Sequence, residues 1–85
     1  MSWELVVAKP AEKSLLRLPT RDRDRIEAAL RAMLDSPFAG DVVRLKGLPV
    51  AWRRRVGSYR VFFDVYPDRT LIVVTAIVRR TSTTY

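Results

Sequence analysis

Hydrophobic residues in the first half of the chain recur at the spacing of an α-helix. Between Thr20 and Ser36 the apolar positions lie three or four residues apart, the pattern of one buried helix face. These positions are Ile26, Ala29, Leu30, Met33 and Leu34. Thr20 is a preferred N-cap residue, and Ser36-Pro37 interrupts the pattern. The sequence therefore predicts an amphipathic helix that begins after Thr20 and ends at Ser36-Pro37.

Two shorter elements are predicted before this helix. The Val-rich segment 3–8 has the composition of a first strand. Pro10 suits the first turn of a helix, where its missing N–H leaves no hydrogen bond unmade. We expect that helix over residues 11–18, with Leu15 and Leu18 facing inward, and Pro19 ends it.

After Gly40 the hydrophobic period changes from 3.6 to 2. Val43 and Leu45 alternate with basic residues, which predicts a strand that closes at Gly47. Three further strands are predicted, over residues 51–56, 59–66 and 71–78. Gly57-Ser58 has the length of a hairpin turn, so the first two of these should pair. The nearly continuous β-branched run 71–78 predicts a central strand that is buried on both faces.

This order of elements predicts an α+β fold. We expect an N-terminal strand and a two-helix hairpin packed on a four- to five-stranded, mostly antiparallel sheet, in the order β-α-α-β-β-β-β. Residues 1–85 form one domain, because neither a linker nor an internal repeat divides the chain.

Composition and charge narrow the possible functions. Residues 1–43 carry seven Lys/Arg against seven Asp/Glu, whereas residues 44–85 carry nine Lys/Arg against two Asp, so the net charge of +7 lies entirely in the second half. The chain has no cysteine and no histidine, which excludes disulfides, thiolate metal sites and the commonest general base. No cofactor or metal is expected. The N-terminus lacks signal-peptide features and no apolar run is long enough to span a bilayer, so we expect a soluble, cytoplasmic protein without membrane contact.

The basic residues of the second half alternate with strand-forming residues. Arg53 and Arg55 are two apart on one predicted strand and therefore share a face, while Arg54 points to the other side. The hairpin should return Arg60 close to Arg55, and Arg79 ends the last strand. Clustered guanidiniums repel one another and are typical of phosphate sites. A solvated basic face without function is the alternative.

The chain resembles toxins of the RelE/ParE superfamily of type II toxin–antitoxin modules, and its RelE-like members in particular. The most specific resemblance is the Gly-x-Tyr-Arg-Val turn that follows an Arg-rich strand. The matching segments are Lys13-Ser14-Leu15-Leu16-Arg17-Leu18-Pro19, Ser36-Pro37, Arg44-Leu45-Lys46-Gly47, Trp52-Arg53-Arg54-Arg55-Val56-Gly57-Ser58-Tyr59-Arg60-Val61, Ile77-Val78-Arg79 and Tyr85. The resemblance covers nearly the whole chain.

The resemblance implies a ribosome-dependent endoribonuclease that cleaves mRNA in the A site without a metal. The reaction would be attack of a 2′-OH on the neighbouring phosphate, which gives a 2′,3′-cyclic phosphate and a free 5′-OH. The residues carried over as catalytic are Arg55, Arg60, Arg79 and Tyr85, and those expected to bind RNA are Arg53, Arg44, Lys46 and Arg80. Arg55 and Arg60 would hold the phosphate, Arg79 would stabilise or protonate the leaving 5′-oxygen, and Tyr85 would stack on a base or orient the nucleophile.

One departure from the family pattern concerns the general base. Positions 53 and 55 are often lysine in the mRNA-cleaving branch, but both are arginine here. A lysine whose pKa is depressed loses its proton, whereas an arginine keeps it. The resemblance therefore leaves Arg55, or a water that it holds, to stand in as base.

Two other functions remain open from the sequence. One is a ParE-like toxin that poisons DNA gyrase, and the other is a non-catalytic RNA-binding domain. The resemblance also implies partners, namely a RelB-like antitoxin, the ribosome and mRNA, with DNA contacted only through the antitoxin. The antitoxin is expected to be acidic at least locally and to bind by strand addition or as a helix laid across the sheet.

Overall fold

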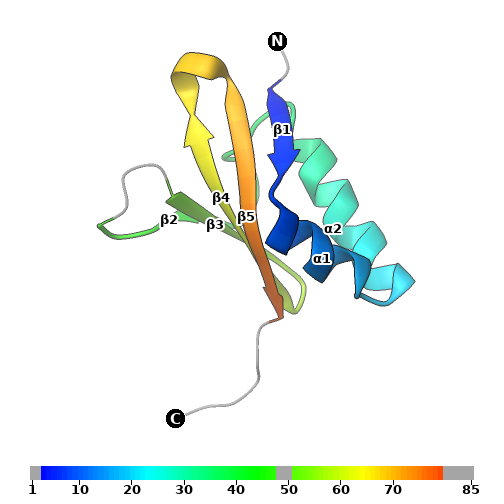
Figure 1. The fold of residues 1–85 in the computed structure, drawn as a ribbon. Helices are drawn as coiled ribbons and strands as arrows, with labels where there is room; N and C mark the ends of the chain where they lie inside the picture. Colours follow the sequence, from blue (N-terminus) through cyan, green and yellow to red (C-terminus); the bar gives the residue numbers. More distant parts are fainter. Residues whose placement is uncertain (1–2, 48–50, 80–85) are drawn as a thin grey trace.

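A five-stranded mixed sheet forms the centre of the molecule (Figure 1). The computed structural model describes residues 3–47 and 51–79. The strands are β1 (Glu4–Val7), β2 (Val42–Arg44), β3 (Ala51–Val56), β4 (Tyr59–Tyr66) and β5 (Leu71–Arg79), arranged in the order β1-β5-β4-β3-β2. β1 pairs with β5 in parallel, and the other neighbours are antiparallel. The predicted α+β fold is therefore confirmed, with five strands and one parallel pair.

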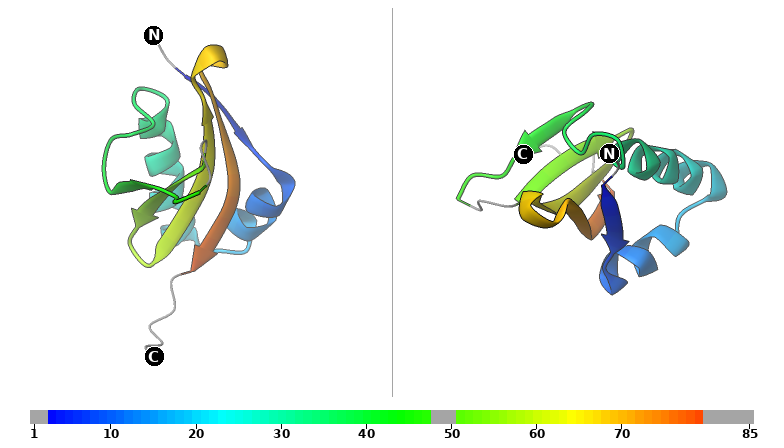
Figure 2. Two further views of the ribbon diagram at one scale, coloured as in Figure 1. Left: turned by 90° about the vertical axis from the view of Figure 1, so that its left-hand side faces the viewer. Right: turned by 90° about the horizontal axis from the view of Figure 1, so that it is seen from above.

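Two helices connect β1 to β2 and lie together on the side of the molecule away from β2 (Figure 2, right). α1 spans Lys9–Leu16 and α2 spans Thr20–Met33. Pro10 lies in the first turn of α1, where no intrahelical partner for its nitrogen is needed. Pro19 holds the extended backbone that precedes α2.

The core lies between these helices and one face of the sheet. Alternate residues of β4 are buried, and so are the helix positions that recur three and four apart. The fully buried large side chains are Phe63, Ile26, Met33, Ile72, Val61 and Val74. The predicted stripe of α2 is confirmed at Ile26, Ala29, Leu30 and Met33, while Leu34 is half-buried.

Two turns close the ends of the β3–β4–β5 meander. Gly57 opens the tight turn between β3 and β4 at a φ of +56°, a left-handed backbone that glycine adopts without a steric penalty. A short 3₁₀ helix, η1 (Pro67–Arg69), joins β4 to β5 at the other end (Figure 1). The β3–β4 turn and the C-terminal end of β5 therefore lie side by side, because Tyr59 pairs with Arg79.

Several predicted details were wrong. Thr20 is the first residue of α2 and not its cap, because Pro19 occupies the N-cap position. α1 begins at Lys9 and ends at Leu16, two residues earlier at each end than predicted. β2 ends at Arg44 and is therefore shorter than the strand predicted from the alternation that continues to Lys46.

The prediction that residues 71–78 are buried on both faces was also wrong. The burial of β5 alternates, with Ile72 and Val74 buried and their neighbours half-buried. The helices cover only one face of the sheet, so β-branched residues here mark a strand in the middle of the sheet rather than one covered on both sides. Within the described residues no helix is long and apolar enough to cross a membrane.

Candidate functional site

The face of the sheet opposite the helices carries the basic residues of the β3–β4 hairpin. Residues that are directly paired across antiparallel strands point to the same face. Arg55 pairs with Arg60, and Arg53 pairs with Phe62. Arg60 and Phe62 alternate along β4 with the buried Tyr59, Val61 and Phe63, so they point to the opposite face. These arginines therefore point away from the helices, as the alternation along the sequence predicts. We call this side of the sheet the open face.

Asp41, Arg55 and Arg60 form one row across the open face. The Arg55 Nε lies 2.9 Å from the Asp41 Oδ2, and both side chains are about half exposed. The Arg55 backbone N–H donates to the Asp41 carbonyl, which places Asp41 beside Arg55 at the start of β2. On the other side Arg60 is the direct partner of Arg55 in β4. The row brings together a carboxylate and two guanidiniums, and we call it the Asp41 row.

The electrostatics of the Asp41 row favour an anion. Directly opposed side chains in antiparallel strands have Cβ atoms about 5 Å apart, and like charges at that separation repel. Asp41 compensates part of this repulsion through Arg55, but Arg60 has no ion pair with any carboxylate in residues 3–47 and 51–79. A phosphate placed above Arg55 and Arg60 would neutralise both guanidiniums and accept several hydrogen bonds.

Arg79 lies on the other side of the sheet. It pairs with Tyr59, whose side chain is buried toward the helices. The reason is a β-bulge in β5 opposite Phe62 and Phe63. The extra residue is Thr75, and its hydroxyl donates to the Phe62 carbonyl at 3.2 Å. A bulge shifts the alternation by one residue, so Arg79 changes face.

The structure thus brings Arg53, Arg55 and Arg60 onto one face and leaves Arg79 on the other, at the same end of the molecule. The strand register therefore does not place all four arginines on a single face. Arg79 is the exposed last residue of β5, beside the β3–β4 turn, so its approach to the Asp41 row is around the end of the strand.

A second cluster joins α2 to the β3–β4 turn. The Tyr59 hydroxyl donates to the Asp22 Oδ2 at 2.8 Å, and Arg25 lies against Gly57. The hydrogen bond to Asp22 is the main cause that raises the pKa of Tyr59 above its ordinary value of 10.0, with burial and the charge of Asp22 adding to it. The sequence gives no signal for this link, because Asp22 and Tyr59 lie on different elements and no local pattern relates them.

Arg54 occupies an unusual position between the two arginines of the open face. It points toward the helix side, where its Nε and Nη1 atoms are buried without a hydrogen-bond partner. Its guanidinium lies against Gly40, so close that a Cβ added there would be 2.9 Å from the nearest nitrogen. Nearby, the rings of Trp52 and Phe38 pack against each other in a tilted arrangement, with centroids 4.7 Å apart and an interplanar angle of 55°.

The remaining predicted residues are dispersed or outside the described part. Arg44 ends the edge strand β2 on the side of Trp52, and Lys46 is exposed in the turn that follows. Arg80 and Tyr85 lie outside the described residues. Among residues 3–47 and 51–79, no group of three His, Cys, Asp or Glu side chains is arranged to hold a metal ion.

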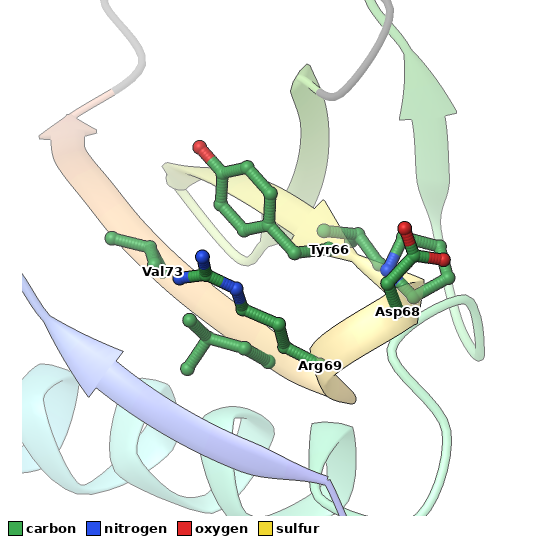
Figure 3. A pocket seen from close by; sticks show the side chains of 7 residues that line it. Tyr66, Asp68, Arg69 and Val73 are labelled. Atoms are coloured by element: carbon green, nitrogen blue, oxygen red, sulfur yellow. The ribbon is translucent and has the colours of Figure 1, made fainter.

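A hollow of about 570 Å³ lies at the far end of the sheet (Figure 3). Its lining comes from Val65, Tyr66, Pro67, Asp68, Arg69, Leu71 and Val73. Figure 3 shows Arg69 extended past Val73 toward the Tyr66 ring, with Asp68 turned away from them. Arg60 and Tyr66 are six residues apart on β4, or roughly 20 Å at the rise of a strand. The hollow is therefore separate from the Asp41 row.

Comparison with known proteins identifies the family. A sequence model of the ParE toxin of the type II toxin–antitoxin system parDE matches residues 5–83. The chain belongs to this toxin family. A toxin RelE1 of Methanocaldococcus jannaschii is 28% identical over 83 residues, which cover 94% of this chain and 92% of the relative. The resemblance to the RelE/ParE superfamily, first inferred from the Gly-x-Tyr-Arg-Val turn, is confirmed.

Solved RelE structures share the fold of this ParE-family chain. RelE in the archaeal RelE–RelB complex from Pyrococcus horikoshii has a TM-score of 0.86 at 24% identity, covering 98% of this chain and 100% of that one. The isolated Escherichia coli RelE toxin has a TM-score of 0.84 at 19% identity, covering 96% and 88%. Since these identities are low, the similarity establishes the fold and leaves the chemistry to be argued from the residues of this chain.

Proposed function

We propose that this toxin is a ribosome-dependent mRNA endonuclease that inhibits translation by cutting mRNA in the A site. The observation that supports the proposal is the placement of Arg55 and Arg60 as direct partners on the open face of a rigid hairpin. Two guanidiniums held side by side can neutralise the charge that develops on a phosphorane, which is the largest single contribution to phosphodiester cleavage of this kind.

The residues divide into those that act on the phosphate and those that hold the RNA. Arg55 and Arg60 bind the scissile phosphate while the 2′-OH attacks it. Arg53, two residues along β3 on the same face, binds the adjoining backbone. Arg79 approaches the leaving 5′-oxygen around the end of β5, and Tyr85 stacks on a base or orients the nucleophile. Further RNA contacts are assigned to Arg44, Lys46 and Arg80.

An antitoxin is the second proposed partner. RelE structures from Pyrococcus horikoshii and Escherichia coli were solved in complex with RelB. We propose a RelB-like antitoxin for this chain, with acidic residues that neutralise the open face and with any DNA contact made by the antitoxin. The toxin would act in the cytoplasm, where ribosomes and mRNA are found.

The competing function is poisoning of DNA gyrase. What favours it is the family description, which names the ParE toxin of parDE. A gyrase poison would need a surface for a protein partner and no cleavage chemistry, so Arg60 would contribute binding alone.

One experiment separates the two functions. The toxin is expressed from a tight promoter, mRNA 5′ ends are mapped, and gyrase–DNA cleavage complexes are measured in the same cells. We expect new mRNA ends within codons on ribosomes, and a loss of about 100-fold or more in cleavage for Arg60→Ala, the typical effect of removing one charge-stabilising donor. Arg21→Ala, on the exposed side of α2, is the matched control and should cleave normally. Gyrase complexes without new mRNA ends would overturn the proposal.

A further inference from the structure

The proposed reaction requires a group that accepts the proton of the attacking 2′-OH. The guanidiniums of the open face cannot do so, because arginine does not deprotonate in proteins. The chain has no histidine and no cysteine. Arginine stands at both position 53 and position 55, so neither side chain can act as a lysine base. Lys46 lies in the turn after β2, outside the Asp41 row, so next to Arg55 and Arg60 a carboxylate is the remaining common type of base, and its identity depends on which carboxylates share the open face.

Three carboxylates lie on the open face among the described residues, and one of them, Glu4 of β1, is at the η1 end of the sheet, because it pairs with Leu71. Asp64 belongs to β4 on the open face, but it is four residues from Arg60, or roughly 13 Å along the strand. Asp41 lies in the same row as Arg55 and Arg60, with its Oδ2 2.9 Å from the Arg55 Nε. A phosphate bound by Arg55 and Arg60 is therefore next to Asp41 in the row, and it is four residues along β4 from Asp64.

The ion pair also orients the Asp41 carboxylate. Its Oδ2 is held by Arg55, and the side chain remains half exposed, so the carboxylate is accessible from solvent. Three arginines surround the position of Asp41 at different distances. Arg55 forms the ion pair, Arg60 follows it in the row on the next strand, and Arg54 lies against the neighbouring Gly40 from the other side. Each of them is a fixed cation.

We propose that Asp41 is the general base of the cleavage reaction, an assignment that rests on the proposed nuclease function. The Asp41 carboxylate accepts the proton of the ribose 2′-OH as the 2′-oxygen forms its bond to phosphorus. The bond between phosphorus and the 5′-oxygen breaks, and the leaving oxygen takes a proton from water. The products are a 2′,3′-cyclic phosphate and a 5′-OH, and Asp41 then releases its proton to solvent.

The test uses the full-length toxin on translating ribosomes stalled with a defined A-site codon. Single-turnover cleavage and the affinity of the toxin for the same ribosomes are measured from pH 5 to pH 9 in about half-unit steps. For Asp41→Asn we expect cleavage to fall about 10²- to 10⁴-fold, the usual contribution of a general base. We expect affinity to stay equal or rise, because a negative charge has been removed beside the arginines.

Two controls make the result specific. Asp64→Asn removes the carboxylate of the open face that lies on the same strand as Arg60, and this variant should cleave at the wild-type rate. Asp41→Glu keeps the carboxylate on a side chain that is longer by one methylene, and it should cleave faster than Asp41→Asn. Both variants leave the arginines in place, and their folding is checked by circular dichroism.

The outcomes distinguish failure of this inference from failure of the proposed function. If the wild-type toxin cleaves and Asp41→Asn cleaves equally well or faster, Asp41 is only a counter-ion of Arg55 and the inference is wrong while the nuclease function stands. Loss of cleavage in Asp64→Asn alone would transfer the role to that residue. A wild-type toxin that cleaves nothing would overturn the nuclease function and the base together.

Discussion

At the scale of single residues, three consecutive arginines of β3 have different surroundings. Arg53 and Arg55 point to the open face, whereas Arg54 points toward the helices with two buried nitrogens that lack a partner. An unpaired buried polar group destabilises a fold by the loss of its hydration, and a charged one more so. Arg54 is therefore the residue whose chemistry is least consistent with its position.

This position of Arg54 leads to a stability prediction. Replacing it by methionine keeps the apolar stem of the side chain and removes the unpartnered nitrogens. We expect Arg54→Met to raise the free energy of unfolding by about 1 kcal/mol, the lower part of the range for a buried unsatisfied group. The measurement is urea denaturation followed by tryptophan fluorescence, with the slope of the transition unchanged.

Arg53→Met on the opposite face is the control for this prediction. It deletes the same charge from the same strand and should change the stability by no more than about 0.5 kcal/mol. If Arg54→Met is less stable than wild type, the contact of the guanidinium with Gly40 stabilises the fold by more than the burial of its unpaired nitrogens destabilises it.

The sequence predicted some of the candidate site and missed the rest for a physical reason. The two-residue alternation of a strand is enough to place Arg53 and Arg55 together, and a hairpin with a two-residue turn then makes Arg60 the partner of Arg55. The face of Arg79 depends on one inserted residue near Thr75, and no turn residue marks that bulge in the sequence. Asp41 was missed because it follows a loop, where no periodicity relates it to β3.

At the scale of elements, the fold was predicted where local patterns decide it. The bounds of β3 and β4 match the predicted ones, since Gly57 and Pro67 mark their ends. The parallel pairing of β1 with β5 is not encoded locally, because it joins segments about 70 residues apart through tertiary packing. The ends of α1 differ from the predicted ones by two residues, which is the usual variation at helix ends.

The link between α2 and β4 through Asp22 and Tyr59 should make stability depend on alkaline pH. The folded state raises the pKa of Tyr59, mainly through the hydrogen bond to Asp22. A raised pKa means that the stabilisation is complete below the unfolded value near 10 and is lost as pH rises through the higher folded value. Tyr59→Phe lacks this hydrogen bond at every pH. We therefore expect the variant to be less stable than wild type at pH 8, and the difference to shrink at pH 11.

Thermal unfolding of both proteins at the two pH values measures this difference. Tyr66→Phe serves as the control, because the exposed Tyr66 forms no such link in the described structure and its variant should follow wild type at both pH values. A Tyr59→Phe deficit that is as large at pH 11 as at pH 8 would mean that packing of the ring, and not the hydroxyl, stabilises the link.

At the scale of the whole molecule, charge and apolar surface occupy different parts of the open face. The Asp41 row lies near the β3–β4 turn, whereas the hollow lined by Tyr66 and Val73 lies at the η1 end. The net charge of +7 comes entirely from residues 44–85. A surface of this kind directs a polyanion to one end of the sheet, and the strength of the attraction depends on salt.

Salt dependence then measures which arginines contact phosphates. For single-stranded RNA the logarithm of the binding constant falls with the logarithm of salt concentration by about 0.7 per neutralised phosphate. If Arg60 neutralises one phosphate, Arg60→Ala should weaken binding of a short RNA and reduce the magnitude of this slope by about 0.7. Arg21→Ala deletes an equal charge on the exposed side of α2 and should leave the slope unchanged. Both variants carry the same net charge, so a difference between them arises from position alone, and equal slopes would show that RNA does not bind at the Asp41 row.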